Sequence, residues 1–418
     1  MPYPKMLRLR QEFDRPRVEN LPAAIRGALE KLDLGKTIRP GQTVALTAGS
    51  RGIANIPVIL KSVAQFLKDL GAKPFLVPAM GSHGGGLAEG QKKVLESYGI
   101  TEAFVGVPIR ASMEVVSLGN TSEGFPVVLD KYAKEADHIG VVARVKPHTT
   151  YHGPIESGLM KMMMIGLGKH AGASNYHRLL LEQPYDLVVR SVGKTIRARA
   201  PITFGLGVVE NAHDETARIE AALPGDFEKC EEELLVCAKK WLARLPFHEA
   251  DLLIIDEIGK EISGSGMDTN VVGRKRAFRT APPENQPNMR FIFIRGLSEH
   301  THGNAAGLGV ADFTTTRLVK AMNYKATVIN CLTAGYPDGA NLPVHLDSDR
   351  EVLDAVLSIL GTRPAEKTRI MHIKNTMLLE TVEASEACLE ELSKMTRFKV
   401  VAGPETLTFD ANGNLRSL

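Results

Sequence analysis

Cysteine is scarce in this chain of 418 residues, which contains four. Cys230, Cys237, Cys331 and Cys388 are scattered and include no Cys-x-x-Cys pair. Thiols in this arrangement are typical of a reducing compartment, and they argue against a cysteine zinc site and against an iron–sulfur cluster. We therefore expect a cytoplasmic protein.

Long apolar runs and blocks of like charge are also missing. No apolar run approaches the roughly 20 residues that a membrane helix needs, and residues 1–16 lack the apolar core of a signal peptide. The 51 Lys and Arg residues nearly balance the 48 Asp and Glu residues, which gives a net charge of +3. Neither a membrane nor nucleic acid is therefore expected as a main partner. The oligomeric state is left open.

The hydrophobic pattern alternates between short apolar runs and amphipathic runs at helical spacing. This βαβα order predicts a parallel sheet with right-handed crossovers. Strands are expected at 43–48, 74–80, 138–145 and 201–210, and helices at 56–71, 88–100 and 226–245.

A second alternation of the same kind starts with the apolar run at 250–259. The fold class expected is therefore α/β, with two α/β domains, mainly parallel sheets and an active-site cleft between the domains. In the tail, Asn412-Gly413 lies between β-prone residues and predicts a hairpin that packs back on the first domain. The expected divisions are 1–247, 248–396 and 397–418. The second domain continues with 290–297, 314–324, 325–332 (a strand position of the alternation), 350–361 and 369–375.

Three loops of the first domain follow expected strands, at 48–52, 81–86 and 145–153. In open parallel sheets, ligands bind beyond the carboxyl ends of the strands. Each loop carries one polar side chain that could act in binding or catalysis, and these are Arg51, His83 and His148. A lone loop arginine is more often a solvated surface residue. The glycines of the second loop serve either tight backbone geometry or a phosphate cradle.

Residues 148–177 hold four of the twelve histidines of the chain. Their spacing does not suit zinc, because there is no His-Glu-x-x-His and no carboxylate one helical turn from a paired histidine. The three methionines at 162–164 indicate core filling. The sequence also lacks a Gly-x-Gly-x-x-Gly fingerprint between a strand and a helix, a P-loop and a Gly-x-Ser-x-Gly elbow.

Taken in order, the motifs resemble those of the nickel-pincer-nucleotide-dependent lactate racemase superfamily of 2-hydroxyacid racemases and epimerases. That family has an arginine in the first strand–helix loop, a Gly-x-His loop and a Pro-His pair, which Arg51, His83 and His148 match. A Ser-Gly-x-x-Lys follows, here with Lys161, and His177 lies sixteen residues further on without a gap in the spacing. The resemblance covers most of the chain.

The resemblance implies a cofactor, nickel pyridinium-3,5-bisthiocarboxylic acid mononucleotide, in a catalytic N-terminal domain. Lys161 would tether it covalently, and His177 would be the protein ligand to nickel. His83 and His148 would be the paired acid and base, and Arg51 would orient the substrate. Enzymes of cofactor biosynthesis would be transient partners, and recombinant protein made without them would be empty. The residues expected near the cofactor phosphate are Gly84, Gly85, Ser157 and Gly158.

Inverting a hydroxyl-bearing carbon requires that hydrogen leave one face and return to the other face of a planar intermediate. If the hydrogen leaves as hydride, a cofactor must accept it while a base takes the hydroxyl proton. Each enantiomer then needs its own base, and imidazole suits this role because its pKa of about 6.5 allows proton exchange at neutral pH. An arginine fork suits a carboxylate or an oxyanion.

The sequence departs from the lactate racemases in ways that favour another substrate. Ala48 stands where those enzymes often have an acidic residue, and their lysine-containing second-domain motif is not found. We therefore expect a divergent subgroup that acts on a 2-hydroxy acid, for example a polyhydroxylated one such as a sugar acid. Polar residues in Gly-rich loops are either substrate contacts or ordinary turn chemistry. The candidates are His152, Asp268, Asn270, Arg274, His300 and His302.

Two other functions stay open. One is a different metal enzyme, a lyase or hydrolase that uses His148, His152 and His177. The other is a two-domain protein that binds a sugar acid without turning it over.

Overall fold

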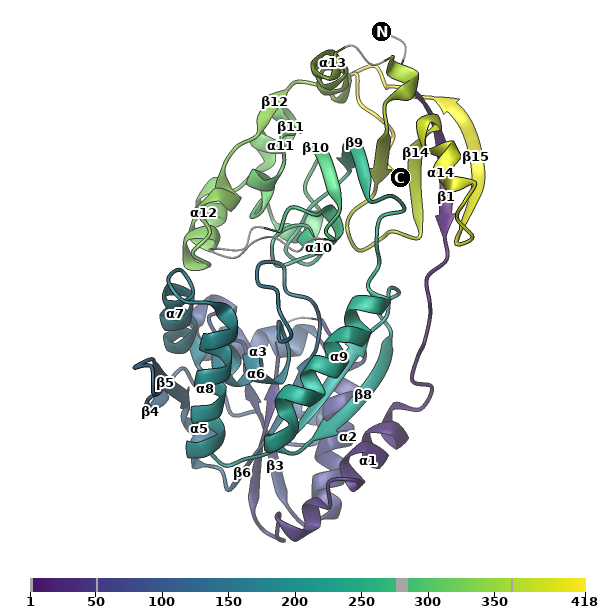
Figure 1. The fold of residues 1–418 in the computed structure, drawn as a ribbon. Coiled ribbons are helices and arrows are strands. Elements are labelled where there is room, and N and C mark those ends of the chain that lie inside the picture. Colours follow the sequence, from purple (N-terminus) through teal and green to yellow (C-terminus); the bar gives the residue numbers. More distant parts are fainter. Residues whose placement is uncertain (1–2, 50–51, 276–284, 362–363) are drawn as a thin grey trace. The chain divides into compact units, whose positions relative to one another are not determined.

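The computed structural model describes residues 3–49, 52–275, 285–361 and 364–418. The chain forms two compact units, each with its own sheet (Figure 1). The first unit comprises residues 14–242. The second unit comprises residues 3–13 together with the described residues from 243 onward. Both units combine helices with mainly parallel strands, so the expected α/β fold class is confirmed.

The first unit is built on a five-stranded sheet in the order β3-β2-β6-β7-β8. The first four strands are parallel, and β8 pairs antiparallel with β7 at one edge. Four of these strands lie where the hydrophobic pattern predicts them. The bounds are β3 Lys73–Pro78, β2 Thr43–Ala48, β6 His138–Arg144, β7 Ile202–Glu210 and β8 Thr216–Ala222.

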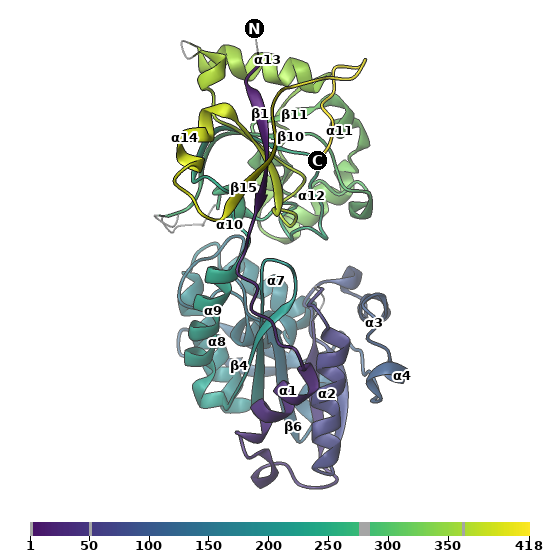
Figure 2. The ribbon, with the colours of Figure 1, turned by 90° about the vertical axis from the view of Figure 1, so that its right-hand side faces the viewer.

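Both faces of this sheet are covered by helices, which explains why its strands are apolar throughout. Val44 and Leu46 pack with the helices α1 and α2, while Ala45 between them packs in the core that includes α8 and α9. Figure 2 shows α1 and α2 on one side of the strands and α8 and α9 on the other. The bounds are α1 Leu21–Glu30, α2 Ile56–Asp69, α8 Tyr185–Arg199 and α9 Phe227–Trp241.

Shorter elements complete the first unit between these layers. A two-stranded hairpin, β4-β5, precedes β6. A helical stretch between β6 and α8 consists of α6, a π-helical turn over Met162–Gly166 and α7. The remaining bounds are α3 Ala88–Ser97, α4 Glu102–Val105, β4 Val115–Asn120, β5 Pro126–Asp130, α5 Lys131–Glu135, α6 Leu159–Lys161 and α7 Lys169–Leu179.

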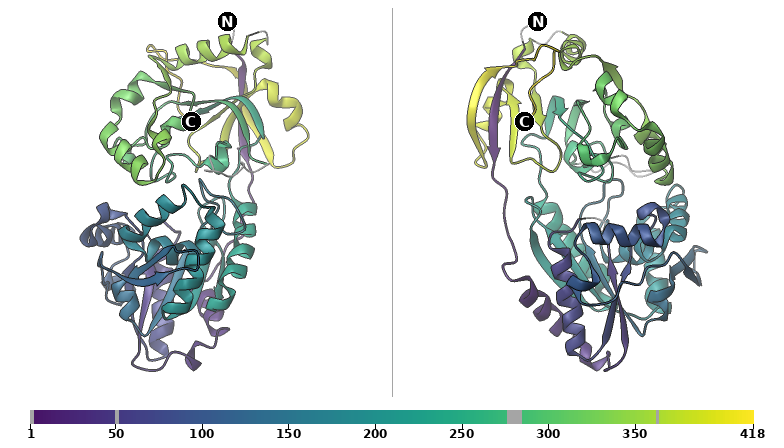
Figure 3. Two further views of the ribbon diagram at one scale, coloured as in Figure 1. Left: turned by 60° about the vertical axis from the view of Figure 1, so that its left-hand side comes forward. Right: turned by 180° about the vertical axis from the view of Figure 1, so that it is seen from behind.

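The second unit contains an eight-stranded sheet in the order β12-β11-β10-β9-β13-β14-β1-β15. The strands from β12 to β13 are parallel, and the last three join by antiparallel pairing. Figure 3 shows β1, from the start of the chain, beside the strands from its end. The bounds are β12 Val344–Leu346, β11 Phe313–Thr315, β10 Asn288–Ile294, β9 Glu249–Ile255, β13 Ile370–Ile373, β14 Thr381–Ser385, β1 Lys5–Gln11 and β15 Phe398–Thr406.

The strand expected at 325–332 is wrong, because this segment is part of the helix α12. The side chain of Asn323 caps the helix by accepting a hydrogen bond from the N–H of Ala326. Thr327 and Cys331, four residues apart, are its buried positions, and that spacing is helical. The helices of this unit are α10 Thr269–Val272, α11 Thr316–Ala321, α12 Tyr324–Thr333, α13 Asp349–Leu360 and α14 Leu389–Leu392.

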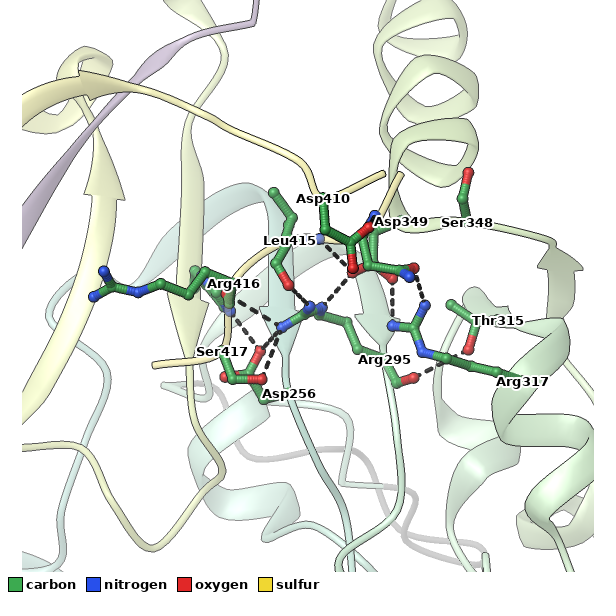
Figure 4. A network of polar contacts seen from close by, with 12 residues as sticks. Asp256, Arg295, Thr315, Arg317, Ser348, Asp349, Asp410, Leu415, Arg416 and Ser417 are labelled. Atoms are coloured by element: carbon green, nitrogen blue, oxygen red, sulfur yellow. Dashed lines mark hydrogen bonds and ion pairs between the residues drawn. The ribbon is translucent and has the colours of Figure 1, made fainter. Parts of the chain in front are cut away.

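The tail after β15 is held at the carboxyl ends of the parallel strands of the second unit (Figure 4). Arg295, directly after β10, pairs with Asp256, directly after β9, and its Nε donates to Asp349 Oδ2 at 2.7 Å. The same guanidinium donates to the carbonyl of Leu415. A turn closes at Gly413, whose N–H donates to Asp410 at 3.0 Å.

The tail therefore differs in its surroundings from the expected hairpin. The strand β15 pairs with β1. Residues 5–11 of β1 fall inside the expected first domain, but in the structure β1 belongs to the second unit.

Across the described residues, no helix combines the length and apolar character that crossing a bilayer requires.

Candidate functional site

The strands β3, β2 and β6 are neighbours and run parallel, so the loops that follow them leave the same edge of the sheet. Two of these loops carry His83 and His148. The third includes Arg51, which lies outside the described residues, as does Ser50. The arrangement required for a shared site is thus present at the level of the backbone.

The segment that includes Lys161 and His177 contacts all three loops. The N–H of Gly81 donates to the carbonyl of Gly166 at 3.4 Å, and the N–H of Lys146 donates to the carbonyl of Ser157 at 3.0 Å. A Cβ at Gly49 would lie 3.2 Å from Cε of Met162. The sequence motifs at the ends of β2, β3 and β6 therefore meet one helical segment.

Lys161 is the last residue of α6, and His177 lies in the last turn of α7. Between them runs the π-helical turn, a conformation that often marks functional positions. Both side chains are half-buried, so part of each is open to a ligand. Nδ1 of His177 is buried.

The ring of His148 is held in one tautomer by its own loop. Its Nδ1 accepts hydrogen bonds from the N–H of Thr150 at 3.0 Å and the N–H of Tyr151 at 3.2 Å. Because both partners are backbone donors, Nδ1 carries no proton, and the neutral ring carries its proton on Nε2. His148 is thus set to donate from Nε2.

Glu156 anchors this loop from within the motif. Its carboxylate accepts from the N–H of His148 at 2.7 Å and from the N–H of Gly153 at 3.2 Å. Nζ of Lys239 on α9 lies 2.6 Å from the same carboxylate. The side chain of Glu156 is almost fully buried, so this ion pair is shielded from water on the Glu156 side.

Aromatic rings support His148 from the side. Tyr151 stacks on His148 with ring centroids 4.7 Å apart, and Tyr185 stacks on Tyr151 at 4.5 Å. The hydroxyl of Tyr185 donates to the carbonyl of Glu156 at 2.6 Å. The stack links the histidine loop to the start of α8.

His83 is exposed, and its loop is fixed through backbone atoms. Nε2 of Gln91 donates to the carbonyl of Gly81 at 2.9 Å and to that of His83 at 3.3 Å. Gly84 packs on Gly90 so closely that a Cβ would lie 2.5 Å from the carbonyl carbon. A Cβ at Gly85 would meet nothing within 4 Å. Gly84 is therefore required by packing, whereas Gly85 faces open space.

A fully buried lysine stands behind the His83 loop. Nζ of Lys169 donates to the carbonyl of Pro78 at 2.7 Å and to Oε1 of Gln91 at 3.0 Å, and it lies 3.3 Å from Oδ2 of Asp130. Burial lowers the pKa of Lys169 and raises the pKa of Asp130, while their mutual attraction opposes both shifts. This network ties the end of β3 and the loop of His83 to the start of α7.

The loop after β2 is held in a similar way by an ion pair. Arg144, at the end of β6, pairs with Glu210, at the end of β7, and both side chains are largely buried. Arg144 donates to the carbonyl of Gly52 at 3.1 Å, and Glu210 accepts from the N–H of Ala54 at 2.6 Å. The pair therefore fixes the backbone that directly follows residues 50–51.

Glu231 of α9 lies under the segment of Lys161. Its side chain is fully buried, and Oε2 accepts from the N–H of Met160 at 2.9 Å. Burial raises the pKa of Glu231 to about 7, against the opposing effect of backbone N–H groups and the charge of Lys161. Sequence reasoning missed this residue. Its signal was the helical spacing that places it, with Phe227 and Leu234, on the apolar face of α9.

Comparison with known proteins gives one family match and two similar solved structures. The family model for the lactate racemase N-terminal domain matches residues 9–187. The lactate racemase apoprotein from Thermoanaerobacterium thermosaccharolyticum has a similar structure, with a TM-score of 0.51, 13% identity, and coverage of 87% of this chain and 93% of that one. The family match and the shared fold together support a divergent member of the lactate racemase superfamily.

A second solved structure, of a protein from Thermotoga maritima, gives a TM-score of 0.52 at 14% identity over 79% of this chain and 84% of that chain. At these identities the likeness concerns the fold. A search of curated proteins finds no match. The match to the lactate racemase N-terminal domain suggests an isomerase of the racemase type. The matched range includes Arg51, His83, His148, Lys161 and His177.

The candidates of the second unit lie outside this range. Asp268 caps α10 by accepting from the N–H of Asn270 at 2.9 Å and also accepts from its side-chain amide. Arg274 pairs with Asp312 at 2.6 Å and donates to nearby carbonyls. His300 and His302 are exposed in a short turn. Cap chemistry accounts for Asp268 and Asn270, and contacts with residues 289–312 hold Arg274.

Within the described part of the chain, no three His, Cys, Asp or Glu side chains converge in a way that could hold a metal ion. His148, His152 and His177 therefore do not form a three-ligand metal centre there. A metal at His177 would need most of its ligands from a cofactor. This requirement agrees with a superfamily whose lactate racemases use a nickel cofactor.

Proposed function

We propose that this chain is a racemase or epimerase that inverts the hydroxyl-bearing C2 of a 2-hydroxy acid by proton-coupled hydride transfer, using a nickel-pincer nucleotide attached at Lys161. One observation carries the proposal. The loops of His83 and His148 leave one edge of the sheet and contact the segment that contains Lys161 and His177.

The residues present fit such a cofactor. The half-buried amine of Lys161 would be the attachment point, and a ring nitrogen of His177 would be the protein ligand to nickel. When bound, the group supplies an acceptor for the substrate hydrogen as hydride. Successive left-handed glycines with open space at Gly85 suit the cofactor phosphate. Gly158 suits it less, because the carboxylate of Glu231 lies directly behind it.

The two histidines have different roles in proton transfer. His148 holds its proton on Nε2, so it donates to the substrate oxygen when a carbonyl is returned to a hydroxyl. His83, exposed at the end of its loop, takes the hydroxyl proton in the opposite half of the reaction. Arg51 binds the substrate carboxylate, a role that suits a guanidinium fork.

The test is co-expression of the chain with the cofactor-biosynthesis enzymes and nickel, followed by intact mass and peptide mapping. We expect an adduct of cofactor mass on Lys161, which Lys161→Ala abolishes. The loaded protein should then racemise members of a panel of 2-hydroxy acids and sugar acids. An unmodified Lys161, with a lactate racemase loaded in parallel, would contradict the proposal. Tight binding of a sugar acid without turnover would favour a binding protein instead.

A further inference from the structure

A buried carboxylate stands under the segment of Lys161 without a role in the chemistry proposed above. Glu231 occupies the apolar face of α9 beside Phe227, Leu234 and Leu235, and its side chain is fully buried. A buried carboxylate is costly, and an apolar side chain of similar volume would pack there with less penalty. Packing alone therefore does not explain it.

The carboxylate of Glu231 meets the start of α6. This short helix begins after Gly158, which has no side chain to cap it. Oε2 of Glu231 accepts from the N–H of Met160, two residues into the segment, at 2.9 Å. Glu231 thus supplies from another helix the acceptor that a capping side chain normally provides.

Gly158 explains how close this contact is. A Cβ at this position would lie 2.6 Å from the carboxyl carbon of Glu231 and 2.8 Å from Oε1. The backbone of Gly158 is extended, with φ of 175°, so the requirement for glycine is one of space and not of conformation. The glycine of the Ser-Gly-x-x-Lys motif therefore leaves room for this carboxylate.

We propose that Glu231 is a positioning residue for the cofactor attachment point, because its carboxylate fixes the backbone from Gly158 to Met160 and so sets the direction of Lys161. The proposal rests on the proposed function in that Lys161 receives the cofactor. Glu231 itself contacts neither substrate nor cofactor.

The test compares Glu231→Leu and Glu231→Gln with Glu232→Gln in the full chain. Glu232 is the next residue on α9, half-exposed and paired with Arg190 at 2.8 Å. Under co-expression, we expect Glu231→Leu to keep the fold but to lower cofactor attachment at Lys161 at least tenfold. Glu231→Gln, which keeps one acceptor oxygen, should recover part of the attachment, and Glu232→Gln should behave as the wild type.

A second measurement needs no cofactor. In the unloaded protein, we expect Glu231→Leu to raise hydrogen exchange of the peptide that includes Met160 and to raise acetylation of Lys161 at least threefold relative to the exposed Lys240. Wild-type exchange and acetylation in a folded Glu231→Leu variant would overturn the positioning role. If the wild-type chain acquires no cofactor, the proposed function fails, and this second measurement still decides whether Glu231 positions Lys161.

Discussion

Nζ of Lys169 lies 3.3 Å from Oδ2 of Asp130, and both side chains are fully buried. The pair is the centre of the network that joins the end of β3, Gln91 and the start of α7. Taking away one partner leaves the other as an uncompensated polar group in the core. This relationship makes Lys169 a structural residue of the His83 loop, although it lies inside the motif segment.

We predict that Lys169→Met lowers the free energy of unfolding by about 3–5 kcal/mol, the range for breaking a buried pair from one side. Urea denaturation measures the change. Lys131→Met is the matched control, since Lys131 pairs with Glu114 at the surface and its loss should leave the free energy of unfolding nearly unchanged. Equal effects of the two variants would show that the buried network is unimportant.

The tautomer of His148 gives a second prediction. Because Nδ1 accepts from two backbone N–H groups, we expect ¹⁵N NMR of labelled imidazoles to show the Nε2–H form at neutral pH. Glu156→Ala removes the acceptor of the His148 and Gly153 N–H groups and should let the second tautomer appear. A wild-type spectrum dominated by the Nδ1–H form would contradict the loop geometry.

Gly158 and Glu231 should be energetically coupled. We expect Gly158→Ala to lower the free energy of unfolding by roughly 1–3 kcal/mol through overpacking, and Glu231→Ala in the same chain to relieve part of that loss. Thermal unfolding of the two single variants and the double variant measures the coupling. Gly27→Ala is the control, because a Cβ at Gly27 in α1 meets nothing within 4 Å. Additive effects of Gly158→Ala and Glu231→Ala would argue against the close contact.

The pKa of Glu231 predicts a pH dependence of stability. Burial raises this pKa from 4.5 to about 7, so the folded chain binds a proton that the unfolded chain releases between these values. The stabilising contribution of this proton is therefore complete below pH 4.5 and is lost as the pH rises to about 7. Since one pKa unit corresponds to about 1.4 kcal/mol, the loss is about 3 kcal/mol.

The measurement is the difference in unfolding free energy between the wild type and Glu231→Gln across this pH range. We expect the wild type to lose stability relative to the variant as the pH rises. A difference that stays constant with pH would mean that the carboxyl group keeps an ordinary pKa in the folded chain.

How far the sequence predicts the structure depends on whether a signal is local. Residues 43–48 form the expected strand because their apolar run is bounded on both sides, and α2 follows its helical spacing. The segment 325–332 misled because its β-branched residues favour a strand, while the cap at Asn323 lies just outside it. Propensity was overridden there by capping and by the burial of Thr327 and Cys331.

The candidate site divides in the same way. His83, His148, Lys161 and His177 are found from spacing along the chain, since each lies in a short motif. Apart from Glu156, which lies within the motif, the residues that hold these loops come from other elements, and only the fold brings them together. Glu210 pairs with Arg144 across neighbouring strands, and no local sequence pattern predicts this contact. Such supporting contacts are therefore found only from the three-dimensional structure.

The pairing of β1 with β14 and β15 has a consequence for the order of folding. Residues 5–11 hydrogen-bond only with strands formed by residues 381–385 and 398–406 among the pairings of the sheet. During synthesis, the unit of residues 14–242 can therefore close its core while β1 waits for residues 381–406 to be made. During that interval the backbone N–H and C=O groups of β1 lack their strand partners, which leaves β1 open to pairing with other chains.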